Sequence, residues 1–200
     1  MAITHERFEQ GLTVEQYIAQ MTQNRDTFER NQAQAALRPE DVAFFERLPQ
    51  SINTLIITED WCGDALANVP VLAALAERTG KLNLRLFLRD QSLDLADQYL
   101  KEGKYRSVPV FVFFDQQMRE LGHFIERPAD ATAEMRAATE RLAAEHPELP
   151  DLTASFDTLS DEARRLRAQS LRELRASRSA AWTAMLLDDI ERLLSAQPIA

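Results

Sequence analysis

Residues 55–65 read LIITEDWCGDA and place Cys62, the one cysteine of the chain, where a short apolar strand passes into a helix. The apolar run that opens this stretch is typical of a buried strand, and helical apolar spacing begins after the cysteine. A thiol at a helix N-terminus faces unpaired backbone N–H groups and the positive end of the helix dipole, and both favour the thiolate. The stretch therefore predicts a strand–turn–helix unit that carries sulfur chemistry.

The residues next to Cys62 limit that chemistry. Ala65 stands where a Cys-x-x-Cys pair has its second thiol, so no disulfide can form within the chain. The carboxylate of Asp64 opposes ionisation of a neighbouring thiol, and no His or Lys lies close in sequence to act as a base. We expect a reactive but only moderately acidic thiol, and the competing interpretation is a buried, inert cysteine.

The remaining pattern predicts an α/β protein. Thr13 and Pro39 mark the starts of helices in the first fifty residues, and Gly80 closes the helix that follows the cysteine. Short and alternating apolar runs predict further strands, and 3.6-residue spacing predicts further helices. The elements expected after the first fifty residues are strand 55–58, helix 65–79, strand 82–88, helix 93–100 with its end near 103, strand 110–114, strand 119–124 and helix 130–145.

This order of elements, the motif WCGD at 61–64 and the stretch SVPVF at 107–111 resemble the thioredoxin superfamily, in its bacterial branch of thioredoxin family proteins with a Trp-Cys-Gly-Asp motif. The resemblance implies a thioredoxin fold, a central mixed β-sheet flanked by helices, with a right-handed first crossover. It also implies that Cys62 is the nucleophile, that Pro109 lies opposite it in the cis form, and that the backbone of Val108 pairs with extended peptide substrates. The other substrate-binding residues expected from the resemblance are Trp61, which would shield the thiol, Gly63 and Asp64.

The chain departs from the superfamily pattern at two positions. Ala65 replaces the resolving cysteine, and Ile56 stands where redox-active members keep a buried acid. Glu59 and Asp60 are candidate substitutes for that acid, although acidic residues at a strand end are more often solvated. The triplet ERP at 126–128 fits the same branch and equally fits a turn flanked by solvated charges. Three roles stay open for the thiol: mixed disulfides that a small thiol resolves, covalent capture of protein partners, or no redox role.

Prolines at 147 and 150 indicate a linker after the helix that precedes them. They divide the chain into an N-terminal helical extension (1–50), a thioredoxin-like domain (51–146) and a C-terminal helical extension (151–200). The last part begins with a cap at Ser160 and carries apolar residues at helical spacing, as one long helix or two packed ones. Its Trp182, Met185 and Ile190 either line an interface or pack on the core, which leaves homo-oligomerisation open.

The net charge of −9 argues against a general binder of nucleic acid or anionic membranes, because either needs a positive docking surface. Six arginines and one glutamate between residues 164 and 178 give that stretch a local charge of +5. Such a stretch marks an anionic partner or docks on the acidic body of its own chain, and we favour the second.

The scattered positions of His5, His123 and His146 do not suggest a metal site, and we expect no metal and no cofactor. The single cysteine, the absence of a basic and apolar leader, and the lack of an apolar run of about 20 residues favour the cytoplasm and no membrane contact.

Two functional hypotheses follow. In the first, the protein is an enzyme-like monothiol: Cys62 attacks a disulfide in a protein or a low-molecular-weight substrate, and an external thiol resolves the mixed disulfide. In the second, the protein is a non-catalytic thioredoxin-like interaction module that keeps the peptide groove and uses its helical ends for assembly.

Overall fold

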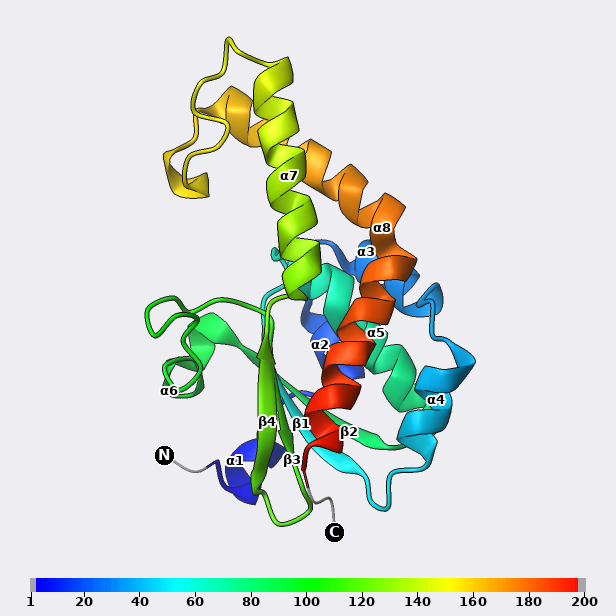
Figure 1. The fold of residues 1–200 in the computed structure, drawn as a ribbon. Coiled ribbons are helices and arrows are strands. Elements are labelled where there is room, and N and C mark those ends of the chain that lie inside the picture. The colour runs from blue at the N-terminus through cyan, green and yellow to red at the C-terminus, as the bar shows by residue number, and fades with distance from the viewer. Residues whose placement is uncertain (1–2, 198–200) are drawn as a thin grey trace.

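The computed structural model describes residues 3–197, and its centre is a four-stranded sheet in the order β2-β1-β3-β4 (Figure 1). The strands are β1 (Ile52–Thr58), β2 (Leu82–Leu88), β3 (Val110–Phe114) and β4 (Glu120–Ile125). β1 and β2 are parallel, whereas β3 pairs antiparallel with both β1 and β4. The mixed sheet flanked by helices confirms the fold class expected from the sequence.

The helices follow the expected order with one correction. They are α1 (His5–Glu9), α2 (Val14–Gln20), α3 (Arg25–Ala33), α4 (Pro39–Glu46), α5 (Gly63–Thr79), α6 (Leu93–Ala96), α7 (Ala129–Glu145) and α8 (Asp161–Ser195), with 3₁₀ turns η1 (Arg89–Gln91) and η2 (Phe156–Thr158). Thr13 caps α2 in a capping box with Gln16, and Gly80 ends α5 in the left-handed conformation that glycine adopts without strain.

The helix expected from 93 to about 100 was wrong in length, because α6 ends at Ala96. Glu102 and Gly103 have left-handed backbone angles that turn the chain back on itself, and Lys101 pairs through its backbone with Tyr105. The apolar residues that suggested a longer helix are nevertheless buried, since Leu95 and Tyr99 pack under the sheet. The apolar spacing therefore predicted correctly that these side chains are buried, but predicted incorrectly that the backbone is helical.

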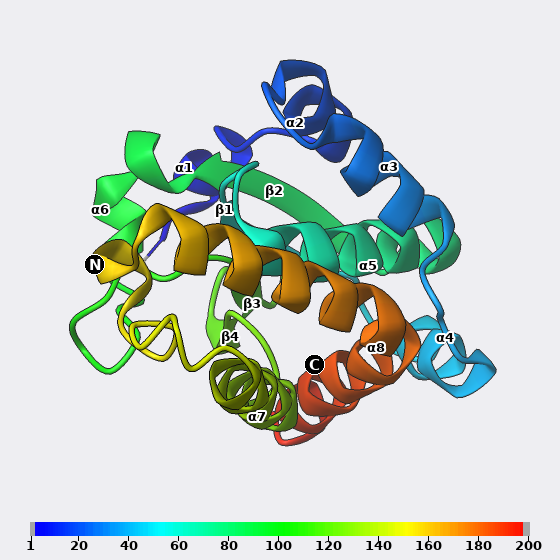
Figure 2. The same cartoon turned by 90° about the horizontal axis from the view of Figure 1, so that it is seen from above.

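Each strand sends alternate side chains into two separate cores. Ile52 and Ile56 of β1 point to one face of the sheet, and Leu55 and Ile57 point to the other. The first face is covered by α5, by α8 and by α2 to α4. Figure 2 shows α5 between α3 and α8. The second face is covered by α1 and the segment around α6. Cys62 touches both cores because it lies at the end of β1.

The segment before α2 pairs with β2, a strand at the edge of the sheet. The backbone of Leu12 exchanges two hydrogen bonds with Leu86 of β2, at 2.9 and 2.8 Å. Gly11 permits this approach, because a Cβ atom there would lie 2.6 Å from the ring of Phe87. The N-terminal helices are thus tied to the sheet by backbone pairing as well as by apolar contact.

α8 is one helix of 35 residues, which settles the choice between one helix and two. Its second half buries Leu186, Leu187, Ile190 and Leu194 in the same core as α5 and the sheet. Its first half projects beyond the sheet beside α7 (Figure 1). The residue boundaries at 51, 146 and 151 stay a prediction, whereas the shared core shows that α8 packs as part of the fold.

None of the described helices has the length and apolar character that a membrane span requires.

A cluster of charges joins α4 to α8. The guanidinium of Arg38 binds both Asp41, which is fully buried, and Asp188. Glu191 lies beside this group, and one of its carboxylate oxygens is buried without a hydrogen-bond partner among the described residues. Burial, followed by the charge of Asp41, raises the pKa of Glu191 to about 7. The protonated form of Glu191 is therefore the one that suits the folded state.

We expect Glu191→Gln to stabilise the protein above pH 7 and to leave its stability near pH 4 unchanged. The folded pKa of Glu191 lies above its unfolded value, so its stabilising contribution is complete below the unfolded pKa and is lost as pH rises through about 7. After allowance for solvent screening, the gain at pH 8 is about 1–2 kcal/mol. Urea denaturation at several pH values measures it, with Glu173→Gln on the exposed side of α8 as the control. Parallel curves for the Glu191→Gln variant and the wild type would contradict the assignment.

Candidate functional site

A groove of about 740 Å³ opens at the end of β1, where α5 begins. The turn before α5 contributes Trp61 and Cys62, the first turn of α5 contributes Asp64, and the segment before β3 contributes Val108. The other wall comes from η1, α6 and the loop that follows it. The remaining lining residues are Arg89, Asp90, Leu93, Asp97, Leu100, Lys104, Tyr105, Arg106, Ser107 and Glu126.

Cys62 caps α5 and is half-buried in the groove wall. Its Sγ donates to the carbonyl oxygen of Val108 at 3.3 Å, a contact that only the protonated thiol can make. Burial, followed by the charge of Asp64, raises the pKa of the Cys62 thiol above its ordinary value. The backbone N–H groups of Ala65 and Asp64, and the charge of Arg175, act in the opposite direction but are smaller. We expected a moderately acidic thiol with Asp64 opposing its ionisation; Asp64 does oppose it, but burial adds a larger effect, so the expected lowering of the pKa was wrong in net direction.

Asp64 is held by two arginines from different parts of the chain. Arg127, in the turn between β4 and α7, binds one carboxylate oxygen, and Arg175 of α8 binds the other at 3.0 Å. Gly63 makes room for this arrangement, because a Cβ atom there would lie 3.2 Å from the guanidinium carbon of Arg175. The carboxylate beside the thiol is thus a structural junction of three elements as well as a source of negative charge.

The triplet at 126–128 belongs to the same network. The Glu126 carboxylate forms ion pairs with Lys101 at 2.7 Å and with Arg127 at 3.1 Å. Its backbone carbonyl accepts a hydrogen bond from the side-chain amide of Asn68 in α5 at 2.7 Å. The side chains of Glu126 and Arg127 are only 14% and 16% exposed. The interpretation of these residues as solvated turn charges was wrong. Their partners outside the triplet are distant in sequence, so no local pattern indicated the contacts.

Large apolar side chains are exposed around the groove. Trp61, Leu93 and Tyr105 are 47%, 43% and 58% exposed, and all three line it. The ring of Trp61 lies under the guanidinium of Arg89, 4.9 Å away, a cation–π contact that orients it at the groove. Leu93 and Tyr105 were not singled out from the sequence, because their exposure depends on the backbone turn after α6.

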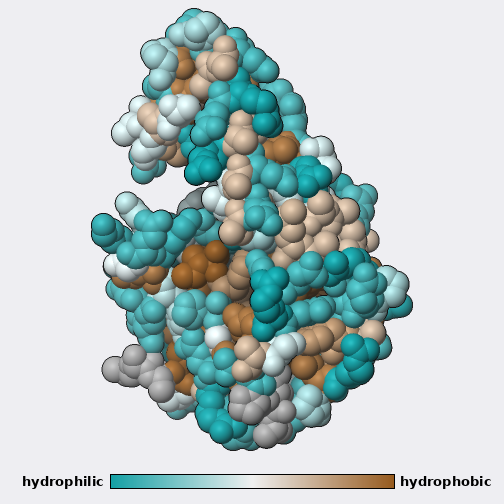
Figure 3. Space-filling view, viewed as in Figure 1, coloured by the Kyte–Doolittle hydropathy of each residue, from teal (hydrophilic) through white to brown (hydrophobic). Residues whose placement is uncertain are grey.

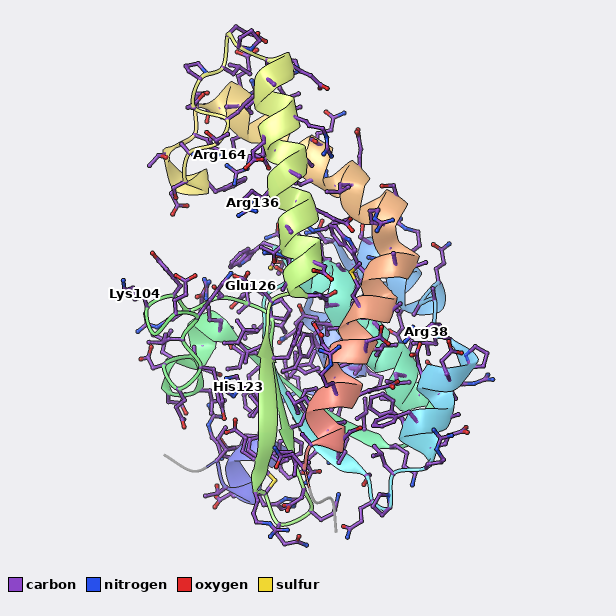
Figure 4. The ribbon with its side chains drawn as sticks, viewed as in Figure 1. Arg38, Lys104, His123, Glu126, Arg136 and Arg164 are labelled. Carbon is purple, nitrogen blue, oxygen red and sulfur yellow. The ribbon has the colours of Figure 1, made fainter. Side chains whose placement is uncertain are left out.

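The molecule is notched on the side of the groove, between the lobe that carries α6 and the projecting ends of α7 and α8 (Figure 3). In Figure 4, Lys104 lies on the lower side of this notch, and Arg136 and Arg164 lie on the upper side. The upper side also carries η2 with the exposed Phe156, whose ring contacts the guanidinium of Arg164 at 5.8 Å. Cationic and aromatic side chains thus face the space in front of the groove from both sides.

Glu59 and Asp60 have other partners than the thiol. Glu59 is buried and accepts from the backbone N–H of Asp90 at 2.9 Å, and its burial raises its pKa. Asp60 accepts from the backbone and hydroxyl of Thr22, which fastens the loop after α2 to the turn before Cys62. No hydrogen bond among the described residues joins either carboxylate to Cys62. The expectation that these acids are solvated was wrong for Glu59.

Of the residues expected at the site, some line the groove and others do not. Pro109 is buried behind Val108 with a cis peptide bond between them, and it does not line the groove. Gly63 faces a second cavity on the other side of the turn. Trp61, Cys62, Asp64 and Val108 therefore come together at the groove.

The arginines of α8 are largely engaged with the rest of the chain. Arg175 binds Asp64, Arg178 binds Glu134 of α7, and Arg167 donates to the carbonyls of Leu152 and Ala154. This agrees with the expectation that the stretch docks on its own chain. Within the described residues, no group of three or more His, Cys, Asp or Glu side chains is placed to hold a metal ion.

A mixed sheet of this order, with a cysteine at the junction of β1 and α5, defines a protein of the thioredoxin-fold class. A family model described as Thioredoxin matches residues 11–141, more than half of the chain, and the protein belongs to that family. The matched range includes α2, α3 and α4 before β1 and ends within α7, so α1 and α8 lie outside it.

Solved structures share the fold at low sequence identity. An HIV epitope-scaffold superposes with a TM-score of 0.67 at 13% identity, covering 96% of this chain and 98% of its own. A Pseudomonas aeruginosa protein of unknown function superposes with a TM-score of 0.64 at 16% identity, covering 98% of this chain and 99% of its own. Among curated proteins, none matches this sequence. Both structural relatives extend over α8, so they share the whole architecture and inform on fold alone.

Proposed function

We propose that the protein binds an extended, disulfide-bearing protein segment in the groove and exchanges disulfides with it through Cys62 as a single thiol. The observation that carries this proposal is the position of the Cys62 Sγ, 3.3 Å from the Val108 carbonyl in a groove edged by exposed apolar side chains. Apolar and aromatic side chains around a groove are typical anchors for a partner.

The exchange runs in three steps. Cys62 loses its proton to solvent, its thiolate attacks one sulfur of the partner disulfide, a mixed disulfide forms, and the other partner sulfur leaves as a thiolate that takes up a proton. Because Ala65 supplies no second thiol, a low-molecular-weight thiol attacks the mixed disulfide and becomes joined to the partner sulfur, which releases Cys62. A second molecule of that thiol then reduces the new mixed disulfide, so two external thiols are oxidised for each partner disulfide reduced.

A second candidate function is favoured by the direction of the pKa shift. A half-buried thiol with a raised pKa and no resolving cysteine also suits a non-catalytic module that uses the groove to bind protein segments. In this case Trp61 and Tyr105 supply the binding energy and Cys62 packs as a small apolar residue.

The cytoplasmic location, the bacterial branch with the Trp-Cys-Gly-Asp motif, and self-association through α8 also remain proposals.

The pH dependence of disulfide exchange separates the two candidates. We expect the rate to rise through neutral pH with its inflection above the unperturbed thiol pKa of roughly 8.5, because burial and Asp64 raise the pKa of Cys62. The measurement follows release of a fluorescent thiol from a disulfide-linked peptide, with Cys62→Ser as the inactive control. A Cys62→Ser variant that binds the peptide as tightly as wild type, together with a wild type that releases no thiol, would establish the module. Exchange that persists in the Cys62→Ser variant would refute the monothiol.

A further inference from the structure

A second, more enclosed cavity of about 370 Å³ lies on the other side of the turn that holds Cys62. It is bounded by α3, α5 and α8, which are neighbours in both ribbon views (Figures 1 and 2). Its volume falls within the range of small-molecule sites. Its apolar surface comes from Leu66, Val71 and Trp182. The groove and this cavity share no lining residue, so both can be occupied at the same time.

The charge around the cavity has one sign. Three arginines line it, Arg30 from α3 and Arg172 and Arg175 from α8, and none of the described residues that line it is Asp or Glu. This is unusual in a chain with a net charge of −9. Within the described part of the chain, Arg30 and Arg172 have no ion pair, although Arg30 donates to the hydroxyl of Thr27 at 3.3 Å. Two guanidinium groups are therefore free to bind an anion.

Polar groups complete the lining. The side chains of Thr27, Gln34, Ser179 and Thr183 border the cavity and supply hydroxyl and amide donors, and so does Asn24, whose amide nitrogen also donates to the Asp60 carbonyl oxygen at 2.9 Å. Thr183 and Trp182 are buried, so this end of the cavity is held in place by the packing of α8. A lining that combines guanidinium, hydroxyl and amide groups with apolar side chains suits a molecule with an acidic group and an apolar body.

Arg175 forms the wall between the cavity and the groove. Its Nη2 and Nε bind Asp64, whereas its Nη1 contacts only the Leu171 carbonyl, at 3.4 Å, among the described acceptors. That remaining N–H capacity lies next to Gly63, which lines the cavity. An anion in the cavity would thus compete with Asp64 for the same guanidinium.

We propose that the cavity between α3, α5 and α8 binds a small organic molecule through a carboxylate or phosphate group, with Arg30 and Arg172 as its main ligands and Arg175 as the link to the groove. The proposal does not depend on disulfide exchange by Cys62. It predicts that occupancy of the cavity alters the reactivity of Cys62 without covering it, because the two sites share the Asp64–Arg175 pair.

Titration calorimetry with three probes tests the site: inorganic phosphate, phenyl phosphate and benzoate, each at matched ionic strength. We expect saturable binding, tighter for phenyl phosphate than for inorganic phosphate because the apolar floor is filled, and about tenfold weaker in Arg172→Gln and in Arg30→Gln. The difference between phenyl phosphate and benzoate identifies the preferred acidic group. Arg165→Gln is the matched control, since Arg165 is an exposed arginine of α8 that does not line the cavity.

The outcomes are decisive in either direction. Saturable binding that survives in Arg165→Gln and in Cys62→Ser, but weakens in Arg172→Gln and Arg30→Gln, supports the site. Absence of saturable heat from all three probes at roughly millimolar concentrations, or an equal loss in the Arg165→Gln control, overturns it. Because the Cys62→Ser protein is included, failure of the exchange assay and failure of this site give different patterns.

Discussion

Asp64→Asn is expected to make Cys62 react several-fold faster with an alkylating reagent at pH 7. After burial, the charge of Asp64 is the largest cause that raises the pKa of the thiol. Removal of the carboxylate leaves Arg127 and Arg175 in place with their positive charges near the thiol, and both then favour the thiolate. The measurement is the alkylation rate as a function of pH, and the inflection should move to lower pH.

The same substitution should cost about 2–4 kcal/mol of unfolding free energy, because the largely buried guanidinium of Arg175 loses its counter-charge and that of Arg127 keeps only Glu126. Asp90→Asn is the matched control: it makes the same chemical change in the groove, but the Asp90 carboxylate that pairs with Arg89 is exposed, so the change should stay below about 0.5 kcal/mol. The reactivity is compared at temperatures where both variants remain folded. An unshifted alkylation profile in the Asp64→Asn variant would show that burial alone sets the pKa of Cys62.

Leu187→Ala is expected to have the largest effect on stability, a loss of about 3–4 kcal/mol from a fully buried site on α8. The side chain lies in the core shared by α5 and the sheet, so the cavity left by its truncation should destabilise the whole fold and not α8 alone. Denaturant unfolding should remain a single transition when it is followed by circular dichroism and by tryptophan fluorescence, since Trp61 and Trp182 report from the site and from α8.

Leu93→Ala provides the control for this experiment, because Leu93 is exposed in the groove and its truncation should change stability by less than about 0.5 kcal/mol. A wild-type-like midpoint for the sheet, with early loss of α8 in the Leu187→Ala variant, would instead mean that α8 is an independent module. That result would support a domain boundary at residue 151.

The predictable part of the fold was local. The alternation in β2, the continuous apolar run in β3, the cap at Thr13, the proline at the start of α4 and Gly80 at the end of α5 each reflect forces that act within a few residues. The helix expected beyond Ala96 failed because the same apolar spacing is satisfied by a turned backbone that buries Leu95 and Tyr99. Periodicity reports which side chains are buried, and it reports the backbone conformation only when the segment is long.

The candidate site shows the same division. The order of residues was sufficient to show that one thiol, without a resolving partner, follows a buried strand and begins a helix next to a carboxylate. The ionisation of that thiol follows from the folded chain instead, because its pKa depends on burial and on the charge of Asp64, whose partners Arg127 and Arg175 lie 63 and 111 residues from it along the chain. Electrostatic energy and desolvation depend on distance in space, whereas hydrophobic periodicity depends on distance along the chain, and a single sequence records the second alone.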